Sequence, residues 1–142
     1  MGKELKNKVR EALEGETKVL YSAVVLSDES HTKLVSTLQS QIPEGWKVFA
    51  HHMTVVFGKG LPEDLKQDLG QSVSLGAVEI GLSDMAIAVK ILGYPSNNDI
   101  PHITVAVNTE AGGKPYDSNR IENWKPIPNI NLIGIVTEVK AS

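Results

Sequence analysis

Two short stretches of this chain, residues 52–55 (His-Met-Thr-Val) and residues 102–105 (His-Ile-Thr-Val), repeat one chemical pattern. Residues i and i+2 of a β-strand point to the same face, so each stretch projects its His and its Thr together. The apolar residues of both stretches face the other way. Two such strands brought side by side would place two imidazoles and two hydroxyls around one small site.

This set of side chains suits the chemistry of phosphate esters. Of the two imidazoles, His52 and His102, one can remove a proton while the other donates one. The hydroxyls of Thr54 and Thr104 can hydrogen-bond phosphate oxygens. The sequence therefore predicts these four residues as the catalytic group.

The composition predicts a single domain over residues 1–142, with 41% hydrophobic and 22% charged residues. A net charge of −3 argues against a protein that coats nucleic acid through a broad basic surface. The chain has no cysteine, which excludes disulfides and thiolate metal sites. The oligomeric state stays open.

The first residues are charged and lead into no long apolar run, so we expect no signal peptide, no membrane span and a cytoplasmic location. Leu5, Val9 and Leu13 recur at four-residue spacing. This spacing predicts a peripheral amphipathic helix within residues 1–16.

Apolar spacing and the positions of proline and glycine predict the remaining elements. In the first half we expect a strand (18–26), a helix capped by Ser27 or Asp28 and stopped at Pro43, strands at 46–49 and 51–57, and a brief helix (62–69). In the second half we expect strands at 77–82 and 85–92, a loop (94–99), a strand (102–107), a helix (119–124) capped by Asp117 or Ser118, and a closing strand (130–139).

The two similar His-x-Thr strands suggest two related lobes. The expected fold is α+β, with antiparallel sheets forming a central cleft and helices outside. Each sheet would carry one motif on an inner strand.

The paired His-x-Thr strands resemble those of the 2H phosphoesterase superfamily, which includes RNA-ligase-like enzymes, 2′,3′-cyclic phosphodiesterases and enzymes that cleave 2′-5′ oligoadenylate. After the second motif, Lys114-Pro115-x-x-Ser118-Asn119 is similar to the cyclic phosphodiesterase domain of fungal-type tRNA ligases. The resemblance covers the organisation of the chain from roughly residue 21 to residue 121.

This resemblance implies a metal-independent phosphodiesterase without a cofactor. Its substrate would be a 2′,3′-cyclic phosphate on an RNA 3′ end or a small nucleotide, opened by water to a 2′-phosphate. By the same resemblance, His52 is the acid that protonates the departing 3′ oxygen and His102 is the base.

Further residues are candidates for substrate binding, namely Tyr21, Lys59, Lys114, Ser118 and Asn119. Each also has a purely structural interpretation, since Lys-Pro is common in loops and Ser-Asn is common at helix starts. Other aromatic residues could stack on a nucleobase or anchor the core: Trp46, Tyr94, Tyr116 and Trp124.

Several alternatives stay open. His31 and His51 are expected to pack or to face solvent, and a histidine metal site is disfavoured because each motif strand offers one His beside Thr rather than a carboxylate. The same catalytic group could instead degrade 2′-5′ oligoadenylate or cyclic oligonucleotide signals, as in phage counter-defence enzymes. A third alternative is an RNA- or nucleotide-binding module without turnover.

Overall fold

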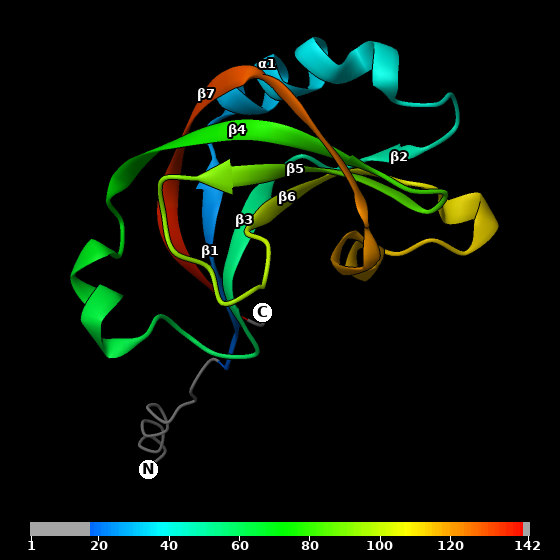
Figure 1. Cartoon of the computed structure of the whole chain (residues 1–142). Coiled ribbons are helices and arrows are strands. Elements are labelled where there is room, and N and C mark those ends of the chain that lie inside the picture. The colour runs from blue at the N-terminus through cyan, green and yellow to red at the C-terminus, as the bar shows by residue number, and fades with distance from the viewer. Residues whose placement is uncertain (1–17, 141–142) are drawn as a thin grey trace.

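A computed structural model describes residues 18–140, so the helix expected within residues 1–16 lies outside the described residues (Figure 1). The strands are β1 (Val19–Leu26), β2 (Lys47–Val48), β3 (His52–Phe57), β4 (Ser72–Leu82), β5 (Ala86–Leu92), β6 (His102–Val107) and β7 (Asn123–Lys140). The helices are α1 (Asp28–Leu38) and the 3-10 helices η1 (Gln39–Gln41), η2 (Glu63–Asp68), η3 (Thr109–Ala111) and η4 (Pro115–Arg120).

All seven of these strands belong to one antiparallel sheet with the order β2-β6-β3-β1-β7-β4-β5. β6 also pairs with β5, which closes six strands into a barrel and leaves β2 as an additional strand. We expected two antiparallel sheets on either side of a cleft. The strands instead form one continuous sheet, because β6 is hydrogen-bonded along both of its edges.

One face of the strands, here called the core face, carries the hydrophobic core. It includes fully buried residues from four strands, Met53, Val89, Ile103 and Leu132. Helix α1 packs on this core through Leu34 and Leu38 and lies across the top of the sheet in Figure 1. The core face therefore holds the sheet and α1 together.

The start of α1 confirms the predicted cap. The Ser27 hydroxyl accepts a hydrogen bond from the backbone N–H of Ser30 at 3.1 Å. The hydroxyl of Ser30 in turn accepts from the N–H of Ile133 on β7, at 2.8 Å. These two bonds satisfy one N–H of the first helical turn and tie the helix to the sheet.

The opposite face, here called the site face, carries a smaller apolar cluster of Ala86, Ala88, Ile121 and Trp124. Gly81 lies opposite Trp124 in the β4–β7 ladder. A Cβ at position 81 would lie 2.7 Å from the indole ring. Only a glycine at position 81 of β4 therefore leaves room for the Trp124 ring, which comes from β7.

The helix expected at residues 119–124 is wrong. The chain forms η4 earlier, from Pro115 to Arg120, and is already extended at Ile121 (φ −68°, ψ 131°). Pro115 presets the helical φ at the start of η4. Burial of Ile121 in the small apolar cluster then requires the chain to leave the helix.

The closing strand begins earlier than expected, because β7 runs through Pro126 and Pro128. In this first part β7 pairs with β4, and its pairing with β1 starts only at Gly134. One edge of β7 is therefore open around the prolines, where a missing N–H removes no ladder bond. The predicted alternation beyond Ile130 is confirmed, with Leu132 buried and Ile133 exposed.

The other elements agree with the prediction to within a few residues. β1, α1, β3, β5 and β6 lie where we expected them, while β4 begins at Ser72, five residues before its expected start. The predicted helix after Pro62 is the 3-10 helix η2. Within residues 18–140 no helix is long and apolar enough to cross a membrane.

Candidate active site

The two His-x-Thr strands are direct neighbours in the sheet. Met53 of β3 pairs with Ile103 of β6, and both side chains are fully buried on the core face. In an antiparallel pair the residues on either side of such a position also oppose each other, with their side chains on the other face. The register therefore brings His52 beside Thr104, and Thr54 beside His102, on the site face.

The loop between β5 and β6, residues 93–101, ends this ladder. Met53 and Ile103 form the single pair between β3 and β6. Beyond it, the Ser96 hydroxyl donates to the carbonyl of Thr54 at 2.8 Å, and the N–H of Asn97 donates to the carbonyl of Val55 at 2.7 Å. The catalytic candidates therefore lie where the regular ladder gives way to a loop.

The imidazole of His52 is held against an aromatic ring. Tyr21 of β1 stacks on it, with ring centroids 5.1 Å apart and planes inclined by 26°. Burial lowers the pKa of His52 below 6.5, and the neighbouring imidazoles of His51 and His102 lower it further. A lowered pKa favours the neutral form of the His52 ring.

His102 is oriented by a carbonyl. Its side chain is buried, with 7% of the residue exposed, and its Nδ1 lies 2.7 Å from the carbonyl oxygen of Ile100. A carbonyl only accepts hydrogen bonds, so Nδ1 carries the proton. This bond leaves Nε2 of His102 available to exchange a proton with a ligand.

Thr104 is also oriented by a neighbour. Its hydroxyl oxygen lies 2.8 Å from that of Ser118 on η4, and Ser118 is buried with 2% exposed. The structure thus places Ser118 against a catalytic candidate rather than at the surface. Lys114 and Asn119 are both exposed, and the Asn119 amide donates to the carbonyl of Tyr116 at 3.2 Å.

Lys59 lies apart from the four catalytic candidates. It is exposed in the turn that follows β3, at the opposite end of that strand from His52. Of the candidates for substrate binding, the structure therefore brings Tyr21 and Ser118 against the catalytic candidates, whereas Lys59, Lys114 and Asn119 are exposed.

The other aromatic residues have structural contacts. Trp46 packs on the main core and Trp124 on the small apolar cluster. The Tyr94 hydroxyl donates to Asp68 at 2.8 Å, and burial together with this bond raises the pKa of Tyr94 to about 12. Tyr116 is 65% exposed and lies under the guanidinium of Arg120. Tyr94 therefore anchors the 93–101 loop to η2.

His31 and His51 stack on each other, with ring centroids 5.0 Å apart and planes inclined by 5°. Nδ1 of His31 lies 2.9 Å from the carbonyl oxygen of Ala50, so it donates a hydrogen bond there. Ala50 has a positive φ of 55°, which places a turn immediately before β3. His51 is exposed and His31 is partly buried, which agrees with the expectation that these residues pack or face solvent.

The prediction from sequence missed a charged pair on the site face. Lys90 of β5 opposes His102 in the β5–β6 ladder, and Glu79 of β4 opposes Lys90 in the next ladder. Residues directly opposed in antiparallel strands share a face. Lys90 is the single charged residue of β5, and this break in an apolar strand is the signal that could have identified it.

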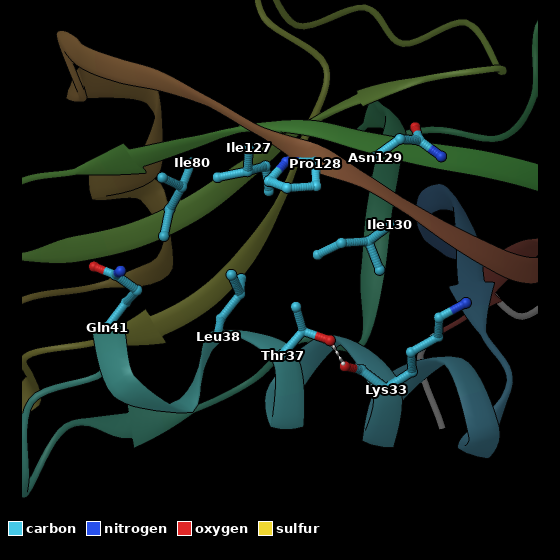
Figure 2. A pocket seen from close by; sticks show the side chains of 9 residues that line it. All are labelled: Lys33, Thr37, Leu38, Gln41, Ile80, Ile127, Pro128, Asn129 and Ile130. Carbon is cyan, nitrogen blue, oxygen red and sulfur yellow. Dashed lines mark hydrogen bonds between the residues drawn. The ribbon is translucent and has the colours of Figure 1, made fainter.

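A separate pocket of about 320 Å³ lies between α1 and β7. Figure 2 shows Thr37 and Leu38 of α1 facing Ile130 of β7 across this pocket. Its lining includes the core residue Ile80 and none of the four catalytic candidates. This pocket is therefore distinct from the site that the His-x-Thr strands form.

Among residues 18–140, no group of three or more His, Asp or Glu side chains is placed to hold a metal ion. The four catalytic candidates offer two imidazoles and two hydroxyls, a set better suited to proton transfer and hydrogen bonding than to metal ligation. No family model and no curated protein matches this sequence.

Proposed function

We propose that this protein is a metal-independent phosphodiesterase of the 2H type that opens 2′,3′-cyclic phosphates on RNA ends or nucleotides. One observation carries the proposal, namely the pairing of Met53 with Ile103. This register gathers two imidazoles and two hydroxyls on one face, and such a set supplies an acid, a base and donors for phosphate oxygens. The two-lobed 2H fold and the cytoplasmic location stay predictions.

In the proposed reaction, water attacks phosphorus in line with the bond to the ribose 3′ oxygen. One histidine removes a proton from the water as the new oxygen–phosphorus bond forms. The other histidine protonates the 3′ oxygen as its bond to phosphorus breaks. The product carries a 2′-phosphate and a free 3′-hydroxyl. Thr54 and Thr104 would donate hydrogen bonds to the non-bridging oxygens, and loss of one such donor can cost roughly 3 kcal/mol of transition-state stabilisation.

The roles of the two histidines are open to test. The resemblance implies that His52 is the acid and His102 the base. The lowered pKa of His52 supports the reverse order, because a neutral imidazole accepts a proton rather than donating one. The hydrogen bond from Nδ1 of His102 to a carbonyl is compatible with the protonated ring that an acid requires.

The test is hydrolysis in the presence of EDTA. Three substrates are compared: a nucleoside 2′,3′-cyclic phosphate, a 2′-5′ oligoadenylate and a 3′-5′ cyclic dinucleotide. His52→Ala and His102→Ala should each reduce kcat by about 10²- to 10⁴-fold, the usual contribution of a general acid or base. His31→Ala is the matched control, because His31 lies on α1 and is not among the groups that lower the pKa of His52.

Turnover that survives EDTA and is lost in both variants would support the two-histidine mechanism, and the preferred substrate would select among the phosphodiesterase alternatives. Hydrolysis that is indifferent to both substitutions would overturn it. Nucleotide binding without any hydrolysis would favour the binding module instead. Circular dichroism of each variant separates loss of chemistry from loss of fold.

A further inference from the structure

A row of polar side chains crosses the site face of three neighbouring strands. Glu79 opposes Lys90 in the β4–β5 ladder, just after a break in its register, and Lys90 opposes His102 in a regular part of the β5–β6 ladder. Figure 1 shows β4, β5 and β6 running side by side. Adjacent strands are about 4.8 Å apart, so the backbone of Lys90 lies one strand spacing from that of His102.

Stability does not explain the charge on Lys90. β5 is covered on both edges, and its other residues from Ala86 to Ile91 are all buried. Lysine is unfavourable in such a strand. The Lys90 ammonium lies 3.9 Å from the Glu79 carboxylate, and both side chains are about one-third exposed (35% and 32%). A pair with this exposure contributes about 0–1 kcal/mol.

We propose that Lys90 binds a second phosphate of the substrate, adjacent to the phosphate that the two histidines attack. This inference rests on the proposed function. The substrate would then be a nucleotide chain with at least two phosphates rather than a nucleoside 2′,3′-cyclic phosphate, which has only one.

The geometry matches this role. Lysine places a compact positive charge at the end of a flexible four-carbon chain, so Lys90 can reach past its own strand while its backbone stays in the ladder. In the free protein, Glu79 holds the ammonium on the site face. An incoming phosphate would replace the carboxylate as the partner of Lys90. Because the distance between the Lys90 ammonium and the Glu79 carboxylate is long and both side chains are partly exposed, breaking this ion pair costs little free energy.

The test compares two substrates that differ by one nucleotide and therefore also by one phosphate. They are adenosine 2′,3′-cyclic phosphate and a diadenosine dinucleotide that ends in the same cyclic phosphate. Lys90→Gln should raise the KM of the dinucleotide about tenfold relative to that of the mononucleotide, as expected when a hydrogen bond to a charged group is lost. Lys90→Arg should preserve the wild-type ratio of the two KM values.

Two further variants complete the design. Lys125→Gln is the matched control, because Lys125 opposes Ile80 and therefore lies on the core-face side of its strand. It should leave the KM ratio unchanged. Glu79→Gln removes the carboxylate that competes with phosphate, so it should lower the KM of the dinucleotide.

The outcomes separate the two proposals. If both substrates are hydrolysed and Lys90→Gln leaves the KM ratio unchanged, the inference about Lys90 is overturned and the proposed function stands. If neither substrate is hydrolysed, both fall. A further comparison with a 3′-5′ cyclic dinucleotide identifies the source of the second phosphate. If Lys90→Gln raises the KM of the linear dinucleotide alone, the substrate is an RNA end. If it raises the KM of the cyclic dinucleotide alone, the substrate is a cyclic oligonucleotide.

Discussion

The hydroxyl oxygens of Thr104 and Ser118 lie 2.8 Å apart and connect strand β6 to helix η4. Ser118 is almost fully buried, so its hydroxyl points at Thr104 rather than into solvent. A threonine that donates to a phosphate oxygen must keep its hydroxyl in one rotamer, and a fixed neighbour supplies that constraint. Ser118 is therefore a positioning residue for the proposed reaction.

We expect Ser118→Ala to lower kcat about fivefold with little change in KM, because a net hydrogen bond of about 1 kcal/mol is lost where Thr104 acts on the transition state. Steady-state kinetics with the preferred substrate measure both constants. Ser40→Ala, at an exposed position on η1, is the control. An unchanged kcat in Ser118→Ala would show that Ser118 only fills space.

The charge of His51 influences the titration of His52. Burial is the largest cause of the lowered pKa of His52, and the next is the imidazole of His51. We expect His51→Gln to raise the pKa of His52 toward 6.5 without reaching it, because burial is unchanged. His51→Lys keeps a positive charge and should leave the pKa low. NMR titration of the imidazole protons measures both, and an equal rise in the two variants would contradict a charge effect.

The acidic limb of the activity profile should follow the same pKa if His52 is the base. The limb in kcat/KM would then lie below pH 6.5 in the wild-type protein and move to higher pH in His51→Gln. If His52 is the acid instead, the basic limb should move upward. The pH dependence of kcat/KM in the two proteins therefore assigns the roles.

Glu138 on β7 links protein stability to pH. The N–H of Leu61 donates to this carboxylate at 2.9 Å, and this bond is the largest cause of the lowered pKa of Glu138. Burial partly opposes this shift, and the Lys66 ammonium, 3.4 Å from the carboxylate, lowers the pKa further. A carboxyl whose folded pKa is lowered contributes stability that is complete above its unfolded pKa, near 4.5, and is lost as the pH falls through the folded pKa.

We therefore expect the Tm of the wild-type protein to fall below about pH 4.5, and Glu138→Gln to flatten this dependence. Thermal unfolding followed by circular dichroism between about pH 3 and 7 covers the window. Glu122→Gln, at an exposed position, should retain the wild-type slope. If Glu138→Gln retains it too, the stabilising bond from Leu61 does not depend on the charge.

Gly81 and Trp124 should be energetically coupled. A Cβ at position 81 would meet the indole ring at 2.7 Å. Gly81→Ala should destabilise the protein by about 1–3 kcal/mol, the usual cost of overpacking, as measured by urea unfolding. In the double variant with Trp124→Leu the cost of the added methyl should largely disappear. Additive costs of the two substitutions would contradict this contact.

Local patterns in the sequence determined most of the individual elements, but not the helix expected at residues 119–124, and they identified the four catalytic candidates. The alternation of residues 52–55 and 102–105 placed each His and Thr on one face and buried Met53 and Ile103, as the structure has it. Ser27 as a helix cap was equally predictable from the sequence. These features depend on residues a few positions apart, where the geometry of a strand or a helix start is sufficient.

Tertiary structure alone decided how the elements meet. The pairing of Met53 with Ile103, the burial of Ser118 against Thr104 and the position of Lys90 beside His102 depend on the register of strands and helices that are distant in sequence. The same holds for the closure of the barrel through both edges of β6. The register is selected by burial over the whole sheet, because a shift of one residue would turn every core side chain of a strand outward. No local sequence pattern contains the total burial energy of the sheet.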